Sequence, residues 1–206
     1  MDDIHLTLLR HGRSLADDED RHEGRYDAPL TNVGRAQATR LADQWATSRT
    51  HFDTVTHSPL QRAAQTAAIL SNTLHVAAQA DPDWMELDNG PLAGLNRAEA
   101  ALRFPSPAPS NPFEPYCGTG ESEWDAYRRA AKALQAVLSL GPGHRLVVAH
   151  GGIINAALRV VSGSAPLANG AGVAFALGDC GHVRLAYVPR RQLWWVLDFV
   201  PSVGTT

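Results

Sequence analysis

The sequence predicts an α/β protein with a mainly parallel sheet, helices on both faces of that sheet, and antiparallel strands near the C-terminus. Segments of strand character alternate with helical segments for most of the chain, which is typical of parallel sheets covered by helices. The chain has 206 residues, 44% of them hydrophobic and 19% charged, so it can bury a sizeable core without a metal or a disulfide. Because a domain takes roughly 100–200 residues, we predict a single domain over residues 1–206.

The first half of the chain predicts two strands, each followed by a helix. Ile4–Leu9 is a short apolar run that stops at a glycine-containing loop, as a buried strand does. Thr31 is suited to cap the next helix, and an apolar stripe continues from there at helical spacing. Phe52–His57 has strand character, and we expect Ser58 and Pro59 to cap and begin the second helix.

The second half predicts a proline-rich loop, further helices and three final strands. Five of the 13 prolines fall within residues 105–115, so we expect an extended loop over about 104–121. The other expected elements are a short strand and an extended segment within 74–94, helices over Ala98–Phe104, Ser122–Leu140 and Ile153–Val161, and strands over Arg145–Ala149, Val173–Leu177, Val183–Val188 and Leu193–Phe199.

Composition argues against several classes of function. The net charge of −3 disfavours non-specific binding of nucleic acid. Lys132 is the only lysine, so a phosphate loop of the Gly-Lys-Ser/Thr type is absent. Cys117 and Cys180 stand alone in the sequence, which fits a reducing compartment, and no apolar run approaches the roughly 18 residues of a membrane span. Since the N-terminus has no signal-peptide core, we expect a cytoplasmic protein without a membrane partner.

Two His-Gly pairs mark the ends of two predicted strands. They are His11-Gly12 and His150-Gly151, and ligands bind at the carboxyl ends of strands in open α/β sheets. Taken singly, each histidine is as typical of a protein core as of a ligand site. However, Arg10 precedes the first histidine and Arg62 follows the second predicted strand, and the planar donors of arginine match phosphate oxygens. Together these side chains predict an anion site for a phosphoryl group.

Glu86 is the candidate general acid. It lies between Met85 and Leu87, and we expect these neighbours to desolvate the carboxyl and keep it protonated near neutrality. A histidine can attack phosphorus in line and form a phosphohistidine, while a carboxyl protonates the leaving oxygen and later activates water. This chemistry requires no metal or other cofactor. The sequence also contains no His-x-His or His-Glu-x-x-His spacing that would indicate a metal site.

Six ordered blocks resemble the histidine phosphatase family, also called the phosphoglycerate-mutase-like family. The blocks are Leu8–Ser14, Gly24–Ala38, Ser58–Ala67, Glu86 with Gly90 and Gly94, Gly120–Ser122, and Val148–Gly152. The resemblance implies a three-layer α/β/α sandwich in which His11 accepts the phosphoryl group and Glu86 donates the proton. It also implies that Arg10, Arg62 and the catalytic His150 bind the phosphate, with Ser14 as a further phosphate-side hydroxyl. We expect the proline-rich loop to lie over or beside this active site.

Within that family, the sequence favours a metal-independent phosphomonoester hydrolase, a histidine-acid-type phosphatase acting on a small phosphorylated metabolite. The mutases place an arginine directly after the glutamate and a tyrosine two residues later, where this chain has Leu87 and Asn89. No basic residue lies between Arg103 and Arg128, so cationic partners for a second anionic group are missing. The stretch Gly94–Glu99 does resemble the mutases, which keeps a cofactor-dependent phosphoglycerate mutase as the alternative. A non-catalytic phospho-ligand or protein-binding module is the second alternative.

Further expectations concern individual residues and one short segment. Many family members carry asparagine six places after the nucleophile, where this chain has Asp17; we expect Asp17 to point elsewhere or to mark a different edge of the substrate. The acidic run Asp17–Asp20 is expected to be a solvated loop. Trp194 and Trp195 are expected on a C-terminal strand with one side in the core, and a homodimer through that edge strand is a further hypothesis. Tyr116 is expected to line a lid over the pocket.

Overall fold

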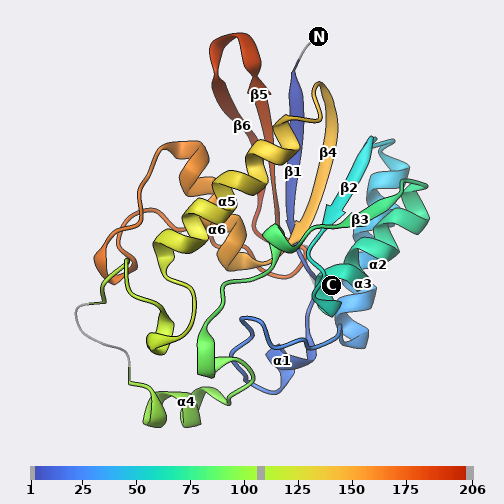
Figure 1. Ribbon diagram of the computed structural model, residues 1–206. Coiled ribbons are helices and arrows are strands. Elements are labelled where there is room, and N and C mark those ends of the chain that lie inside the picture. Colours follow the sequence, from blue (N-terminus) through green and yellow to red (C-terminus); the bar gives the residue numbers. More distant parts are fainter. Residues whose placement is uncertain (1–2, 106–109, 203–206) are drawn as a thin grey trace.

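The computed structural model describes residues 3–105 and 110–202, and its centre is one six-stranded sheet (Figure 1). The strands are β1 (Ile4–Arg10), β2 (Thr54–His57), β3 (Ala78–Ala80), β4 (Gly143–Ala149), β5 (His182–Val188) and β6 (Leu193–Val200), in the order β3-β2-β4-β1-β5-β6. The pairs β1–β4, β2–β4 and β2–β3 are parallel, whereas β5 pairs antiparallel with both β1 and β6. The predicted mainly parallel sheet with antiparallel pairing near the C-terminus is therefore confirmed.

Helices cover both faces of the sheet and make the predicted three layers. On one face, α2 (Asn32–Thr47) and α3 (Gln61–Leu74) pack on a buried cluster that includes Leu9. On the other face, α5 (Glu123–Leu138) and α6 (Gly151–Ser162) pack on a cluster that includes Leu8. Neighbouring residues of one strand point to opposite faces, so β1 supplies both cores. The shorter helices are α1 (Leu15–Asp18), α4 (Arg97–Arg103) and the 3-10 helices η1 (Pro82–Trp84), η2 (Gly90–Leu92), η3 (Tyr116–Gly118), η4 (Ala168–Gly170) and η5 (Pro189–Arg191).

Two helices begin where the sequence predicts, because a local side chain caps each one. The Thr31 hydroxyl accepts a hydrogen bond from the Gly34 amide at 3.0 Å, and α2 starts at the next residue after Thr31. Ser122 and Asp125 form a reciprocal capping box at the start of α5. Such caps satisfy amides that have no partner within the helix. Short-range chemistry is therefore enough to fix both starts.

The predicted start of the helix after β2 is wrong by two residues. α3 begins at Gln61, and its N-cap residue Leu60 makes no side-chain hydrogen bond. Ser58 does not cap the helix because its hydroxyl lies 2.8 Å from Nε2 of His150, on the neighbouring strand. A contact across the sheet thus replaces the local cap.

The predicted strand over Val173–Leu177 is also wrong. These residues form no strand, and β5 already pairs with β1 and β6 on its two sides. The backbone at Phe175 bonds instead to the side chain of Asn155 on α6, through its amide at 2.7 Å and its carbonyl at 3.0 Å. Because a side-chain amide satisfies these backbone groups, the segment needs no strand partner.

Loops gather at the carboxyl ends of the parallel strands. The segment after β1, which carries α1, lies against the segment before α4 through hydrogen bonds between His22 and the backbone of Gly94 and Leu95, at 2.8 and 2.9 Å. Figure 1 shows α1 and α4 together at that end of the molecule. Part of the proline-rich loop, residues 106–109, lies outside the described residues. The part after it runs beside the segment that carries Glu86, since the Glu121 amide donates to the Asp88 carbonyl at 2.7 Å.

The C-terminal strand has one tryptophan in the core and one exposed, as predicted. Trp194 packs against the cluster below α5 and α6, whereas Trp195 on the edge strand β6 is exposed. Of the two cysteines, Cys117 is exposed and Cys180 is buried, and they form no disulfide. Within residues 3–105 and 110–202, no helix has the length and apolar character needed to cross a membrane.

The capping box of α5 makes a testable contribution to stability. Replacing Ser122→Ala removes the side-chain acceptor for an otherwise unpaired amide, and we expect the free energy of unfolding to fall by about 1 kcal/mol. Urea denaturation followed by circular dichroism measures this change. Ser139→Ala, at the exposed end of the same helix, is the matched control and should shift stability by less than about 0.5 kcal/mol. Equal effects of the two changes would contradict the capping argument.

Candidate active site

The two predicted histidines meet at the centre of the sheet. β1 and β4 pair in a parallel register that aligns Arg10 with Ala149, so the residue after each is a histidine at the same edge. The rings of His11 and His150 lie 5.0 Å apart between centroids, at an interplanar angle of 61°. Both residues are fully buried. The structure thus brings together what the sequence places 139 positions apart (150 − 11).

Hydrogen bonds fix which nitrogen of His11 is available. Its Nδ1 lies 2.7 Å from the carbonyl oxygen of Gly12, which can only accept, so Nδ1 carries the proton. In the neutral ring, Nε2 then holds a lone pair, and Nε of Arg62 donates to it at 3.2 Å. His11 therefore presents an unprotonated Nε2 toward a guanidinium group.

The two predicted arginines are held in place by backbone carbonyls. Arg62 is fully buried in the first turn of α3, and its terminal nitrogens donate to the carbonyls of Tyr26 and Gly24, each at 2.8 Å. Arg10 donates to the carbonyl of Leu177 at 2.8 Å, while its buried Nε has no hydrogen-bond partner among the described residues. The backbone carbonyls thus hold each guanidinium group in place, and some of its N–H donors make no hydrogen bond to them.

His150 is held as a neutral ring with one free donor. The hydroxyl of Ser58 accepts from the Leu60 amide at 3.3 Å and lies 2.8 Å from Nε2 of His150, a distance at which it can donate to that nitrogen. Nδ1 then carries the ring proton, and this buried atom has no partner in the part of the chain that the structure describes. Burial, followed by the charge of Arg62 and the neighbouring His11, lowers the pKa of His150 well below its ordinary value.

Glu86 is positioned by the start of α6, which follows directly after His150. Its Oε2 accepts from the Gly152 amide at 2.9 Å, and its Oε1 accepts from the amides of Ile153 at 3.0 Å and Leu87 at 2.8 Å. The sequence predicted a carboxyl desolvated by apolar neighbours, and that environment is wrong. Amide donors at a helix N-terminus surround both oxygens instead, because the extended segment after β3 crosses the end of α6.

Ser14 joins this cluster indirectly. It is buried at the N-cap of α1, and its hydroxyl lies 2.6 Å from Oε1 of Glu23 and 3.0 Å from Oδ2 of Asp17. The expectation that Asp17 points elsewhere is wrong, since its other oxygen lies 3.8 Å from Arg10. The rest of the acidic run, residues 18–20, is exposed as expected.

Glu23 is the residue of this site that sequence reasoning missed. Its carboxylate lies 3.2 Å from Nε of Arg62 and 3.6 Å from Nε2 of His11. Burial raises the pKa of Glu23, but the lowering by His11, Arg62 and Ser14 together is larger than this rise. The pKa of Glu23 therefore lies well below its usual range. The only signal in the sequence was its place in an acid-rich loop after His11, and the turn that aims it, with Gly24 at φ +47°, is not visible there.

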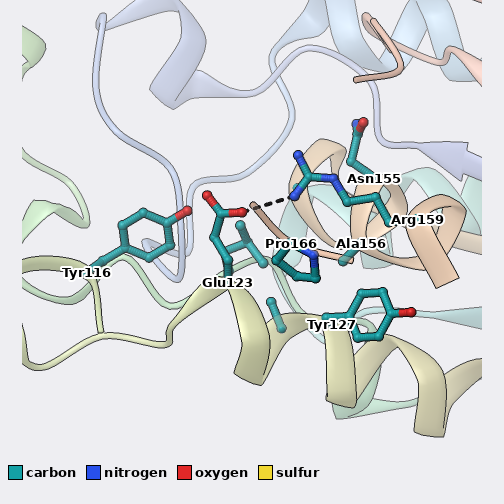
Figure 2. Close-up of a pocket in the computed structure, with 10 residues that line it drawn as sticks. Tyr116, Glu123, Tyr127, Asn155, Ala156, Arg159 and Pro166 are labelled. Carbon is teal, nitrogen blue, oxygen red and sulfur yellow. Dashed lines mark hydrogen bonds and ion pairs between the residues drawn. The ribbon is translucent and has the colours of Figure 1, made fainter. Parts of the chain in front are cut away.

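A cavity of about 130 Å³ adjoins the segment that carries Glu86 (Figure 2). Its lining includes Leu87 and Gly152, whose amides donate to that carboxyl, and Tyr116. Glu123 and Arg159 form an ion pair of 3.0 Å within it. Burial, then the charges of Glu123 and Glu86, raise the pKa of Tyr116 to about 12. Its phenol therefore stays neutral at physiological pH.

The chain is similar in sequence to known phosphatases and mutases. Residues 6–196 match the family model of the histidine phosphatase superfamily, branch 1. The chain is 31% identical to an uncharacterized phosphatase PhoE of Bacillus subtilis, over 78% of this chain and 79% of that protein. It is 28% identical to a probable phosphoglycerate mutase GpmB of Yersinia enterocolitica, over 98% of this chain and 94% of that protein.

A solved structure shares the fold over nearly the whole chain. The mycobacterial glucosyl-3-phosphoglycerate phosphatase superposes with a TM-score of 0.80 at 23% identity, over 96% of this chain and 99% of its own. The match of the family model covers most of the chain and includes both histidines and both arginines of the cluster. The chain therefore belongs to the histidine phosphatase superfamily.

Proposed function

We propose that the protein is a metal-independent phosphomonoester hydrolase that acts through a phosphohistidine at His11 on a small phosphorylated metabolite. The observation that carries this proposal is the pairing of an unprotonated Nε2 on His11 with an unpartnered, buried Nδ1–H on His150. The first atom is a nucleophile and the second is a donor for an anionic oxygen. Arg62 and Arg10 add positive charge on either side, so charge stabilisation does not depend on a metal ion.

In the first step, Nε2 of His11 attacks phosphorus as the bond to the leaving oxygen breaks. The guanidinium groups and His150 stabilise the charge on the three equatorial phosphoryl oxygens. The Gly12 carbonyl remains bonded to Nδ1–H and stabilises the positive charge that develops on the ring. Glu86 donates its proton to the leaving oxygen, so the alcohol departs neutral and Glu86 is left as a carboxylate.

In the second step, water attacks the phosphohistidine. The Glu86 carboxylate accepts a proton from this water while the nitrogen–phosphorus bond breaks, which restores His11 and releases inorganic phosphate. The amides of Gly152 and Ile153 hold the carboxylate in one place for both transfers.

The cavity in Figure 2 supports a small leaving group. Leu87 and Gly152, whose amides both donate to Glu86, are among the residues that line it. Its volume of about 130 Å³ suits a small metabolite better than a protein side chain presented on a folded surface. Tyr116 lies at its border, which supports the expectation that the loop after the prolines covers the substrate.

A phosphoglycerate mutase is the second candidate, favoured by the similarity to GpmB. A mutase must hold a second anionic group of its substrate, and this requires arginines that are free to bind it. Arg159, the arginine that lines the cavity, is paired with Glu123. Three arginines elsewhere in the described residues are paired as well: Arg129 with Glu121, Arg97 with Asp20 and Arg25 with Asp88. These pairings support the hydrolase over the mutase.

The role of His11 is tested by hydrolysis of p-nitrophenyl phosphate in excess chelator. We expect the wild type to be active and His11→Ala to lose at least about three orders of magnitude in kcat, because the nucleophile is removed. Acid quench and mass spectrometry should find one added phosphoryl group on the peptide that carries His11. His144→Ala, at the exposed opposite end of β4, is the control and should retain full activity.

Three outcomes would contradict the hydrolase. Loss of activity in chelator but not in His11→Ala would assign the reaction to another nucleophile. Absence of turnover by the wild type, with activity in a mutase assay primed by bisphosphoglycerate, would favour the mutase. Tight phosphate binding without turnover in either assay would favour a binding module.

The role of Glu86 is tested through the leaving group. Glu86→Gln removes the proton donor but keeps an acceptor oxygen for the amides of α6. We expect the first step to slow by about 10²–10⁴-fold for alkyl phosphates, whose alkoxide is a poor leaving group, and far less for p-nitrophenyl phosphate. Pre-steady-state bursts with both substrate types measure this rate. An equal loss for the two types would mean that Glu86 only positions other residues.

A further inference from the structure

Glu23 is a buried carboxylate that the proposed reaction does not use. It lies in the loop between α1 and α2, and its side chain is 15% exposed. Its oxygens are 3.2 Å from Nε of Arg62, 3.6 Å from Nε2 of His11 and 2.6 Å from the hydroxyl of Ser14. An anionic group therefore already faces the two side chains that the proposed function assigns to phosphoryl transfer and phosphate binding.

The carboxylate and a phosphoryl group compete for the same volume. In-line attack brings the nucleophile to about 3–3.5 Å from phosphorus, and the phosphoryl oxygens lie around that point. Oε2 of Glu23 stands 3.6 Å from the attacking nitrogen, which is where those oxygens must be. The donor on Arg62 can point at only one of the two anions. Glu23 and a substrate phosphoryl group therefore cannot both occupy the position seen for Glu23.

The charges facing Glu23 come from three elements. His11 follows β1, Arg62 belongs to α3, and Ser14 and Asp17 belong to the start of α1. Asp17 lies 3.8 Å from Arg10, so each guanidinium of the site has its own carboxylate. The two guanidinium groups and the two carboxylates therefore cancel in charge. A phosphate dianion gains little net attraction until one carboxylate leaves.

We propose that Glu23 holds the phosphoryl position in the free protein, and that a phosphomonoester binds only by displacing this carboxylate. The inference rests on the proposed function, because it assumes that the phosphoryl group binds between His11 and Arg62. Glu23 then weakens the binding of every phosphate dianion, whatever group the phosphate carries. Contacts to the leaving group must make up the difference, so free inorganic phosphate binds poorly and leaves readily as product.

The test is the affinity for inorganic phosphate of Glu23→Gln, measured by isothermal titration calorimetry at pH 7. The amide keeps the shape and the hydrogen bond from Ser14 but removes the charge. We expect the Kd of phosphate to fall at least about tenfold. The repulsion between two like charges at this separation exceeds the free energy of a tenfold change in Kd, even with strong screening. Glu19→Gln is the matched control: this exposed residue pairs with Arg21 at 2.7 Å in the same loop, and its Kd should stay within about twofold.

A second measurement uses the wild type and does not depend on the variant folding. Phosphate is added to protein with ¹³C-labelled glutamate carboxyls, and the Glu23 resonance, assigned from its absence in Glu23→Gln or Glu23→Ala, should shift with the same Kd as the calorimetric signal. A folded Glu23→Gln with unchanged or weaker phosphate binding would overturn the inference. So would a Glu23 resonance that stays in place while phosphate binds.

The outcomes separate this inference from the proposed hydrolase. If the wild type does not hydrolyse p-nitrophenyl phosphate but Glu23→Gln binds phosphate more tightly than Glu19→Gln, the displacement stands and the hydrolase fails. If hydrolysis requires His11 but the three proteins bind phosphate alike, the hydrolase stands and the displacement fails.

Discussion

The parallel pairing of β1 with β4 is the constraint on which the rest of the site depends. Its register leaves two histidines side by side at one edge of the sheet, fully buried between two helical layers. A buried polar atom without a partner costs about 1–3 kcal/mol, so each ring nitrogen needs a bond. Gly12 and Ser58 satisfy one nitrogen of each ring. Of the other two nitrogens, Nε2 of His11 accepts from Arg62 and Nδ1 of His150 has no partner among the described residues, and their position fixes where an anion can bind.

Backbone groups, more than side chains, hold the charged residues at this edge. Carbonyls of Gly24 and Tyr26 orient Arg62, a carbonyl of Leu177 orients Arg10, and three amides around the start of α6 orient Glu86. Loops therefore set the geometry of a site whose charged groups stand at the ends of regular elements. Groups fixed in this way need no reorganisation as charge develops in a reaction, which is the condition for electrostatic stabilisation of a transition state.

The features predicted correctly are those that local chemistry determines. Thr31 and the box formed by Ser122 and Asp125 place two helix starts, and apolar runs place all the strands except the one expected over Val173–Leu177. The errors arise where a group forms a hydrogen bond to a residue distant in the sequence and not to its local neighbours. Ser58 bonds to His150 instead of capping α3, and Asn155 satisfies the backbone that would otherwise pair as a strand. Glu23 belongs to the same kind, because its partners His11 and Arg62 come from two other elements.

The balance of charge at the site connects these observations to the type of reaction. A mutase retains a bisphosphate through the transfer and benefits from a strongly positive pocket, whereas a hydrolase must release a phosphate dianion after each turnover. Here Asp17 and Glu23 each face a guanidinium group, and the arginine that lines the cavity is paired as well. Uniformly tight binding of phosphate would slow product release without lowering the barrier to its formation. A site that supplies its own competing anion avoids slow release of phosphate. Contacts to the leaving group provide the binding energy when the substrate binds, and the phosphate product no longer carries that group when it dissociates.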